Sequence, residues 1–205
     1  MAALAALGAT AVAGETEREA NLDTDAAREH VKVVDERPDL PSGPFHYRLR
    51  IQDTCPDGTS IDVAVSELGG DITPLEIRRA DTRRGKEVLF AVESAGRGPA
   101  LEARLVAWRK ASSPCRKPRA LFDYDDEDGQ RSRPRGARAL NDYFVSVGDY
   151  APKRPGRELR LDEWFQDRDD PISEPTMLRR SQYRYDKRRD RYVRYSRVLK
   201  RNQEY

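Results

Sequence analysis

The stretch FHYRLRIQDTCPDGTSIDVAV, residues 45–65, carries the clearest secondary-structure signal of the chain. From Phe45 to Gln52 apolar residues alternate with polar ones, which is the period of a half-buried β-strand. The CPDG sequence at residues 55–58 is typical of a turn, because proline fixes φ and glycine accepts tight backbone geometry. Apolar residues alternate again over residues 61–65. The stretch therefore predicts a β-hairpin.

Further short strands are predicted on both sides of this hairpin, separated by Gly, Pro and Asp. The candidate strands are residues 72–78, 86–93, 101–108 and 142–148. Their spacing favours a mainly β protein with an antiparallel, sandwich-like or open-barrel core over residues 44–150. Trp108 lies close to Cys115 rather than midway between the cysteines, which differs from the order in antibody-type domains.

Two cysteines, Cys55 and Cys115, lie 60 positions apart. In an exported chain they predict one disulfide, and closing a loop of this length contributes about 4 kcal/mol in the entropic account. Two unrelated buried thiols are the alternative. Neither cysteine has the CxxC spacing of zinc or redox sites.

The N-terminal residues 1–13 are small and apolar and end in Ala11-Val12-Ala13, the A-x-A pattern of a signal-peptidase site. We interpret them as the remnant of an export signal, although the basic n-region is missing and a plain N-terminal helix is the alternative. Export predicts an extracytoplasmic location: secreted, periplasmic or in an organelle lumen. No later stretch is long and apolar enough for a transmembrane helix.

Charge is unevenly distributed along the chain. Residues 14–42 contain nine acidic and four basic residues, whereas residues 178–205 contain eleven basic and three acidic ones. We expect residues 14–43 to form an acidic extension, with a short solvated helix up to about His30 and a proline-rich linker over residues 35–44. With only 37% apolar residues, the chain is expected to leave some segments solvated or buried on a partner.

Catalytic motifs are absent from the sequence. Only His30 and His46 are present, and no G-x-S-x-G, H-E-x-x-H, P-loop or G-x-G-x-x-G pattern occurs. The acidic residues 123–128 do not fit an EF-hand, because with Gly129 at the sixth position the first and twelfth ligands would be Tyr124 and Arg135. A calcium site of another kind at this loop remains open. We therefore predict a protein that is not an enzyme and that has no cofactor or metal ligands.

The C-terminal part, residues 151–205, combines a proline-rich segment with a basic, tyrosine-rich arm. We predict a helical arm, because Lys and Arg are good helix formers and no Gly or Pro interrupts residues 176–205. Read as a helix, the arm has an apolar heptad stripe formed by Leu178, Tyr185, Tyr192 and Leu199. A hairpin of residues 182–186 and 191–199 is the alternative.

These features predict a non-enzymatic accessory or structural subunit of a larger extracytoplasmic assembly, which docks through its C-terminal extension. Tyr and Arg are enriched at interface hot spots. The predicted partner-docking residues are Trp164, Phe165, Arg184, Tyr185, Arg191, Tyr192, Arg194 and Tyr195. The predicted partner is an acidic surface of another subunit, or the acidic N-terminal segment of the same chain. The alternative is a module that binds an anionic polymer, either nucleic acid or acidic glycan; export argues against nucleic acid.

Overall fold

A computed structural model describes most of the chain. The described residues are 17–23, 25, 27–36, 47–72, 75–81, 85–93, 101–110, 115–148, 158–167 and 175–201. The predicted export signal at residues 1–13 lies outside them, as do residues 37–44 of the predicted linker and residues 151–157 of the proline-rich segment.

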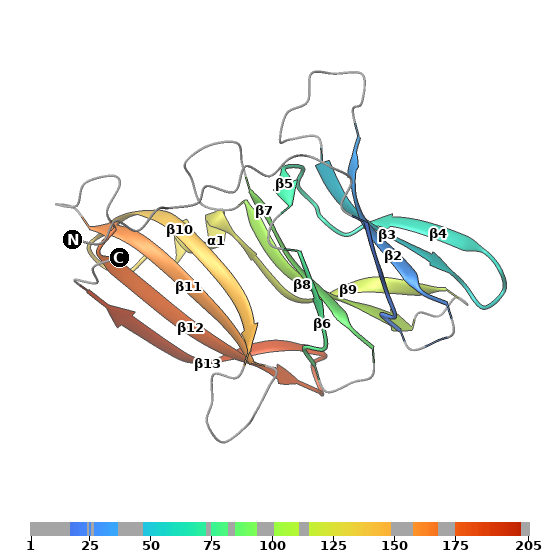
Figure 1. The fold of residues 1–205 in the computed structure, drawn as a ribbon. Helices are drawn as coiled ribbons and strands as arrows, with labels where there is room; N and C mark the ends of the chain where they lie inside the picture. The colour runs from blue at the N-terminus through green and yellow to red at the C-terminus, as the bar shows by residue number, and fades with distance from the viewer. Residues whose placement is uncertain are drawn as a thin grey trace, which may run out of the picture.

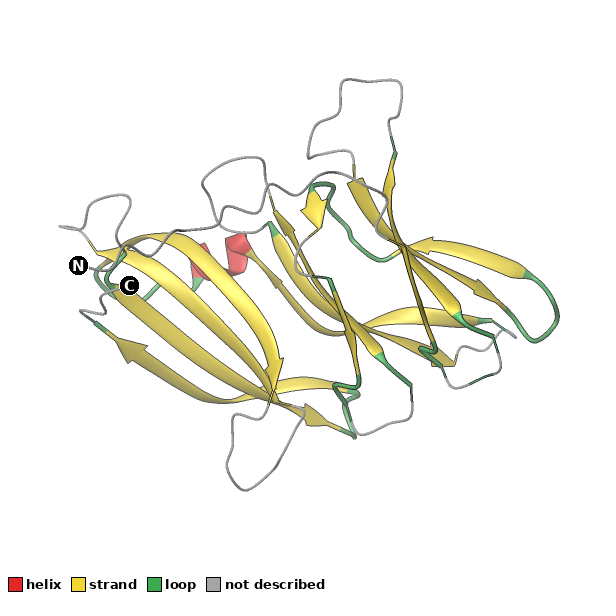
Figure 2. Cartoon of the chain, viewed as in Figure 1, coloured by secondary structure: helices red, strands yellow, loops and turns green. Residues whose placement is uncertain are grey.

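The described chain forms three antiparallel sheets with one short helix (Figures 1 and 2). The N-terminal sheet has the order β1-β2-β3-β4: β1 (Glu17–Ala20), β2 (Glu29–Asp35), β3 (Tyr47–Thr54) and β4 (Ser60–Ala64). The central sheet has the order β5-β7-β8-β9, with β6 also paired to β7: β5 (Asp71–Ile72), β6 (Glu76–Arg78), β7 (Glu87–Glu93), β8 (Glu102–Lys110) and β9 (Arg116–Asp125). The helix α1 (Asp126–Arg131) follows β9, and the C-terminal sheet has the order β10-β11-β12-β13: β10 (Ala137–Gly148), β11 (Glu158–Asp167), β12 (Met177–Asp186) and β13 (Arg191–Lys200).

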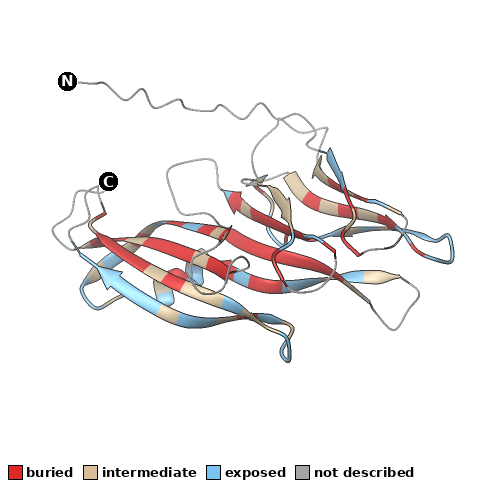
Figure 3. Ribbon diagram, turned by 60° about the horizontal axis from the view of Figure 1, so that its bottom comes forward, coloured by how far each residue is buried: buried red, intermediate tan, exposed pale blue. Residues whose placement is uncertain are grey.

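The central sheet is covered on both faces. In β7, Val88, Phe90 and Val92 belong to the core shared with the N-terminal sheet, whereas Leu89 belongs to the core shared with the C-terminal sheet. Successive side chains of a strand point to opposite faces, so a strand that is buried on both faces needs an unbroken apolar run. This requirement explains the sequence VLFAV in β7. Figure 3 shows the resulting band of buried residues through the middle of the molecule.

The mainly β, sandwich-like prediction is confirmed, and the hairpin predicted at residues 45–65 is formed by β3 and β4. The described strands form three sheets and no barrel. The predicted disulfide is also present: Cys55 and Cys115 are bonded, with their Cα atoms 4.9 Å apart. It links the turn after β3 to the start of β9, so it joins the N-terminal sheet to the central sheet.

The helical prediction for the C-terminal arm is wrong. Residues 177–186 and 191–200 are the antiparallel strands β12 and β13, joined by a turn in which Asp190 has a φ of 50°. The hairpin alternative therefore describes the arm. Tyrosines and arginines alternate in β12, and the tyrosine face is buried by packing against the central sheet, which outweighs the intrinsic helix propensity of Lys and Arg.

The helix predicted near the N-terminus is wrong as well. The described residues of this segment form β1 and the start of β2. Ala20 of β1 and Val31 of β2 are buried in the core between the N-terminal and central sheets. The apolar side chains of this segment are few. The short strands bury them on one face, whereas a lone solvated helix would have left them exposed.

Candidate functional site

The β12–β13 hairpin packs against the central sheet through its tyrosines. The Tyr192 hydroxyl donates a hydrogen bond to the Ala80 carbonyl oxygen at 2.5 Å, and the Tyr185 hydroxyl donates to Asp190. The rings of Tyr185 and Tyr192 lie 5.9 Å apart between centroids. These tyrosines therefore fix the arm to its own chain.

A buried ion pair lies where the C-terminal sheet meets β9. Arg179 Nε donates to Glu163 Oε2 at 2.6 Å, and the Tyr124 hydroxyl donates to the other carboxylate oxygen of Glu163. Arg179 also donates to the Ser132 hydroxyl at 2.9 Å, and its guanidinium lies 4.7 Å from the ring centroid of Phe165. Burial and the charge of Glu163 raise the pKa of Tyr124. Strands β9, β11 and β12 are thus joined by one charged, hydrogen-bonded group.

A second ionic cluster holds the tip of the hairpin. The carboxylate of Asp190 accepts from Arg109 at 3.4 Å and lies 3.3 Å from Arg119 Nε, and Arg109 also pairs with the fully buried Asp81. Both arginines belong to the central sheet. The hairpin is consequently attached to β8 and β9 at its tip and through its tyrosines.

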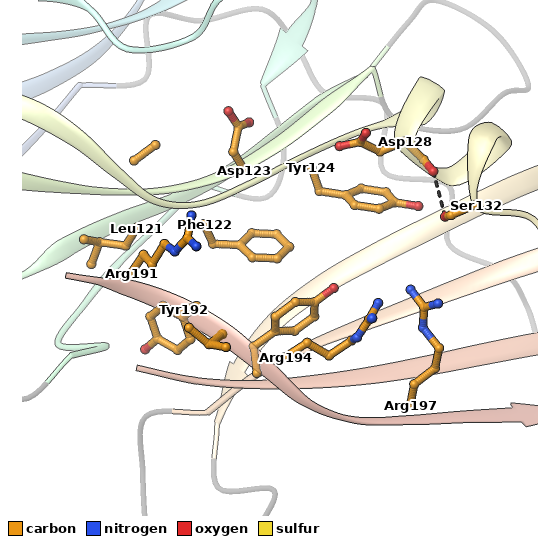
Figure 4. Close-up of a pocket in the computed structure, with 13 residues that line it drawn as sticks. Leu121, Phe122, Asp123, Tyr124, Asp128, Ser132, Arg191, Tyr192, Arg194 and Arg197 are labelled. Carbon is orange, nitrogen blue, oxygen red and sulfur yellow. Dashed lines mark hydrogen bonds between the residues drawn. The ribbon is translucent and has the colours of Figure 1, made fainter. Parts of the chain in front are cut away.

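Between the attachment points lies a groove of about 680 Å³, with β9 on one side and β13 on the other (Figure 4). Aromatic side chains line its floor, where the rings of Phe122 and Tyr183 meet edge to face at 5.1 Å. Arg191, Arg194 and Arg197 line it from β13. In Figure 4, Arg194 and Arg197 extend from β13 toward the side of α1.

The groove is cationic because its arginines have no acidic partner among the described residues. The two acidic residues that line it are already paired, Asp123 with Arg104 and Asp128 with Arg131. Burial, followed by the charges of Arg179 and Arg194, lowers the pKa of Arg197. Uncompensated cations that repel one another form a site that an anion would stabilise.

The structure separates the eight predicted docking residues. Phe165 is fully buried and Tyr192 is 6% exposed, so both pack within the core between the central and C-terminal sheets. Arg191 and Arg194 line the groove, and Tyr185 bonds to the hairpin turn. The remaining residues are Trp164, which is half-buried on β11, and Arg184 and Tyr195 on the opposite face of the hairpin.

On that opposite face, Arg184 and Tyr195 form a local pair. The Arg184 guanidinium lies 4.6 Å from the ring centroid of Tyr195, whose hydroxyl donates to Glu158 at 2.7 Å. Burial and the bond to Glu158 raise the pKa of Tyr195 to about 12. Beyond this pair, Val198 and Leu199 near the end of β13 are exposed, and β13 is the edge strand of its sheet. Figure 3 shows this exposed edge.

The described acidic residues near the N-terminus do not enter the groove. Glu17 and Glu19 lie beside His30, and Glu36 pairs with Arg48 and Arg50, all within the N-terminal sheet. That sheet and the C-terminal sheet lie at opposite ends of the molecule in Figure 1. Asp23 pairs with Arg116 of the central sheet, so within the described residues the acidic segment pairs with the N-terminal and central sheets rather than with the arm.

The acidic residues 123–128 are engaged in local structure. Asp125 caps α1 by accepting from the Asp128 backbone N–H at 2.6 Å, Asp123 forms two hydrogen bonds with Arg104, and Asp128 pairs with Arg131. Their carboxylates balance arginines and a helix terminus, which is the usual role of acidic residues at such a position.

Sequence reasoning missed most of the groove. It selected Arg191, Tyr192 and Arg194 but not Arg197, Phe122 or Tyr183. Alternation with a period of two along residues 182–186 would have placed Tyr183 and Tyr185 on one face. The pairing of that face with β9 is a long-range contact, which local patterns do not report.

Fold and site together define a class: an antiparallel β protein of three sheets with a cationic, aromatic groove and one disulfide. Compared with known proteins, the chain matches no family model, no curated protein and no solved structure. No helix within the described ranges is long and apolar enough to cross a membrane.

Proposed function

We propose that the protein is a non-enzymatic accessory or structural subunit of an extracytoplasmic assembly, and that the groove between β9 and β13 binds an extended acidic segment of another subunit. The disulfide supports an oxidising compartment. The observation that carries the proposal is the row formed by Arg191, Arg194 and Arg197, which has no described acidic partner and lies above aromatic rings.

The geometry of β13 favours an extended ligand. From Arg191 to Arg197 the strand spans about 20 Å at about 3.4 Å per residue, and all three arginines line the groove along this length. As an edge strand, β13 also presents backbone groups that a further strand can pair with. The exposed Val198 and Leu199 extend the contact surface with apolar area.

A module for an anionic polymer is the second candidate, favoured by the same row of arginines. The two functions differ in what they require of the ligand. A polymer such as an acidic glycan binds mainly through its charge, so its affinity falls steeply with salt. A peptide strand also forms backbone hydrogen bonds and apolar contacts, which salt screens far less.

The test compares the affinity of three labelled probes for the full chain across a salt series: a peptide of alternating Glu and Val, a heparin oligosaccharide and single-stranded DNA. We expect the peptide to bind most tightly at physiological salt. The double variant Arg194→Glu/Arg197→Glu is expected to weaken its binding at least tenfold, because two attractive contacts become repulsive.

The matched control is Lys187→Glu/Arg188→Glu, which makes the same charge change in the exposed hairpin turn outside the groove. It should change the peptide affinity by less than about twofold, because exposed charges at a distance are largely screened. Tighter binding of heparin or DNA, lost in the groove variant, would establish the second candidate instead. Equal effects of both variants, or no binding of any probe, would refute a specific groove.

A further inference from the structure

Three buried carboxylates meet between the N-terminal sheet and the central sheet. Asp23 follows β1, Glu29 begins β2 and Asp53 lies in β3, and each has an oxygen within 4.8 Å of an oxygen of the other two. Glu29 is 0% exposed, and Asp23 and Asp53 are each 5% exposed. We call this group the carboxylate triad. It lies far from the groove, in the core region that contains the disulfide.

Each carboxylate of the triad is held in place by a donor from the surrounding structure. These donors are the backbone N–H of Leu22 to Glu29 Oε2 at 2.5 Å, the indole Nε1 of Trp108 to Asp53 Oδ2 at 2.7 Å, and the guanidinium of Arg116 to Asp23 Oδ2. Asp23 Oδ1 also accepts from the Asp25 backbone N–H at 2.9 Å. Orienting contacts of this kind typically surround the ligands of a metal ion.

The remaining oxygens of Glu29 and Asp53 have no hydrogen-bond partner in the part of the chain that the structure describes. Glu29 Oε1 and Asp53 Oδ1 are both buried without a hydrogen bond. Leaving a buried carboxylate oxygen unpaired is costly, so such atoms indicate a missing ligand. The only cation in contact with the triad among the described residues is Arg116. When all groups are ionised, three carboxylates and one guanidinium leave a formal charge of −2, which a divalent cation would balance.

We propose that Asp23, Glu29 and Asp53 bind a divalent hard cation, with Ca²⁺ as the best match. Carboxylate oxygens are the ligands that Ca²⁺ prefers, at about 2.3–2.6 Å, so two ligands of one ion can lie up to about 4.8 Å apart. Mg²⁺ requires shorter distances and near-ideal octahedral geometry, for which a buried, asymmetric triad is less suited.

The site is built into the fold at a point where the two sheets are joined. Gly85, before β7, has a φ of +100°, and a Cβ atom there would lie 2.3 Å from the Leu22 carbonyl oxygen. The loop after β1 therefore packs closely against the central sheet at Leu22, whose backbone N–H orients Glu29. A bound ion would connect this loop, β2 and β3 close to the covalent link at Cys55 and Cys115.

The first test measures the unfolding temperature of the disulfide-bonded full chain at pH 8, after treatment with EDTA and then with added Ca²⁺ or Mg²⁺. At a hundredfold excess over its Kd, a cation that binds only the folded state is expected to raise the unfolding temperature by roughly 5–10 °C. Glu29→Gln and Asp53→Asn should abolish the Ca²⁺ shift. Glu127→Gln, which changes an exposed acid on α1, should preserve it.

The second test locates the ion with Tb³⁺, a Ca²⁺ substitute whose luminescence is sensitised by a nearby indole. Trp108 contacts the triad, whereas Trp164 lies in the C-terminal sheet. We expect sensitised emission that Ca²⁺ competes away, that persists in Trp164→Phe and that disappears in Trp108→Phe. This readout needs only a folded variant, so it remains informative if Asp53→Asn is unstable.

Several results would overturn the proposal. One is an unfolding temperature that does not respond to Ca²⁺. Another is a Ca²⁺ shift of equal size in Glu29→Gln and in the wild-type chain, which would place the ion elsewhere. Emission that depends on Trp164 rather than Trp108 would have the same meaning.

Discussion

The two faces of the central sheet are closed in different ways. Toward the C-terminal sheet, two of the buried acidic groups have arginine partners: Glu163 pairs with Arg179, and Asp81 with Arg109. Toward the N-terminal sheet, the contact is made by aliphatic and aromatic side chains, a disulfide and a carboxylate triad with two oxygens that lack a hydrogen-bond partner among the described residues. On the first face the buried carboxylates named here are neutralised by arginines. On the second face two carboxylate oxygens of the triad have no described hydrogen-bond partner and are available to a ligand.

This difference suggests why the arm's tyrosines are not free for a partner. On this face Tyr124 and Tyr192 connect the two sheets by hydrogen bonds, and Tyr185 donates to Asp190 within the hairpin. The arginines of β13 that take no part in these hydrogen bonds line the groove. In the proposed function, recognition and stability are therefore carried by different residues of one hairpin.

The largest predicted effect comes from breaking the buried pair of the C-terminal side. Arg179→Met should lower the free energy of unfolding by roughly 3–5 kcal/mol, because it leaves Glu163 buried and charged. Denaturant unfolding monitored by circular dichroism measures the loss. Combining Arg179→Met with Glu163→Gln should recover much of it, since the charge is removed and an acceptor for Tyr124 is retained.

The matched control is Arg180→Met, one residue further along β12 on the opposite face. Its partner Asp162 keeps a second arginine, Arg160, at 3.0 Å. We expect a loss below about 1 kcal/mol, as for other partly exposed pairs. Equal losses for the two variants would show that the buried pair has no special role.

Removing the disulfide tests the contact between the central sheet and the N-terminal sheet. Cys55→Ser/Cys115→Ser should lower the free energy of unfolding by about 2–4 kcal/mol, because the unfolded chain regains the freedom of a 60-residue loop. Hydrogen exchange should show lost protection mainly in β2 and β3. If β11 and β12 lost protection first, the two faces would not be independent, and the contrast between them would fail.

A pH effect of Glu87, at the C-terminal side of the central sheet, is expected to be smaller. Burial, followed by the charge of Asp81, raises the pKa of Glu87 to about 7. The folded state thus favours the protonated form, so this contribution is complete below about pH 4.5 and is lost as pH rises toward 7. The loss should be at most about 3.5 kcal/mol, because the pKa rises from 4.5 to about 7 and each pKa unit corresponds to about 1.4 kcal/mol.

The measurement is the difference in unfolding free energy between wild type and Glu87→Gln from pH 4 to pH 8, which cancels other titrating groups. The amide side chain of this variant would mimic the protonated carboxyl group and keep an acceptor for the Ala80 backbone N–H. The wild-type chain should lose stability relative to the variant as pH rises. A flat difference would contradict the raised pKa.

The sequence predicted the β class, the hairpin at residues 45–65 and the disulfide, because these depend on local alternation, turn chemistry and cysteine count. It did not predict the arm as strands. Lys and Arg favour helices, and what decides against one is the packing of the tyrosine face on the central sheet, which is distant in sequence. The carboxylate triad was missed for a similar reason: Asp23, Glu29 and Asp53 lie on separate elements in no motif, and only the fold brings them together.

Each sheet is composed of strands that are consecutive in the sequence. Strand pairing therefore closes loops of modest length within β1–β4, β5–β9 and β10–β13, and the entropy cost of each closure is small. Contacts of high sequence separation arise only where one sheet docks on another. We expect the three sheets to form early and the docking of one sheet on another to limit the folding rate. The central sheet is expected to be the part most prone to aggregation, because both of its faces stay exposed until the other two sheets have docked.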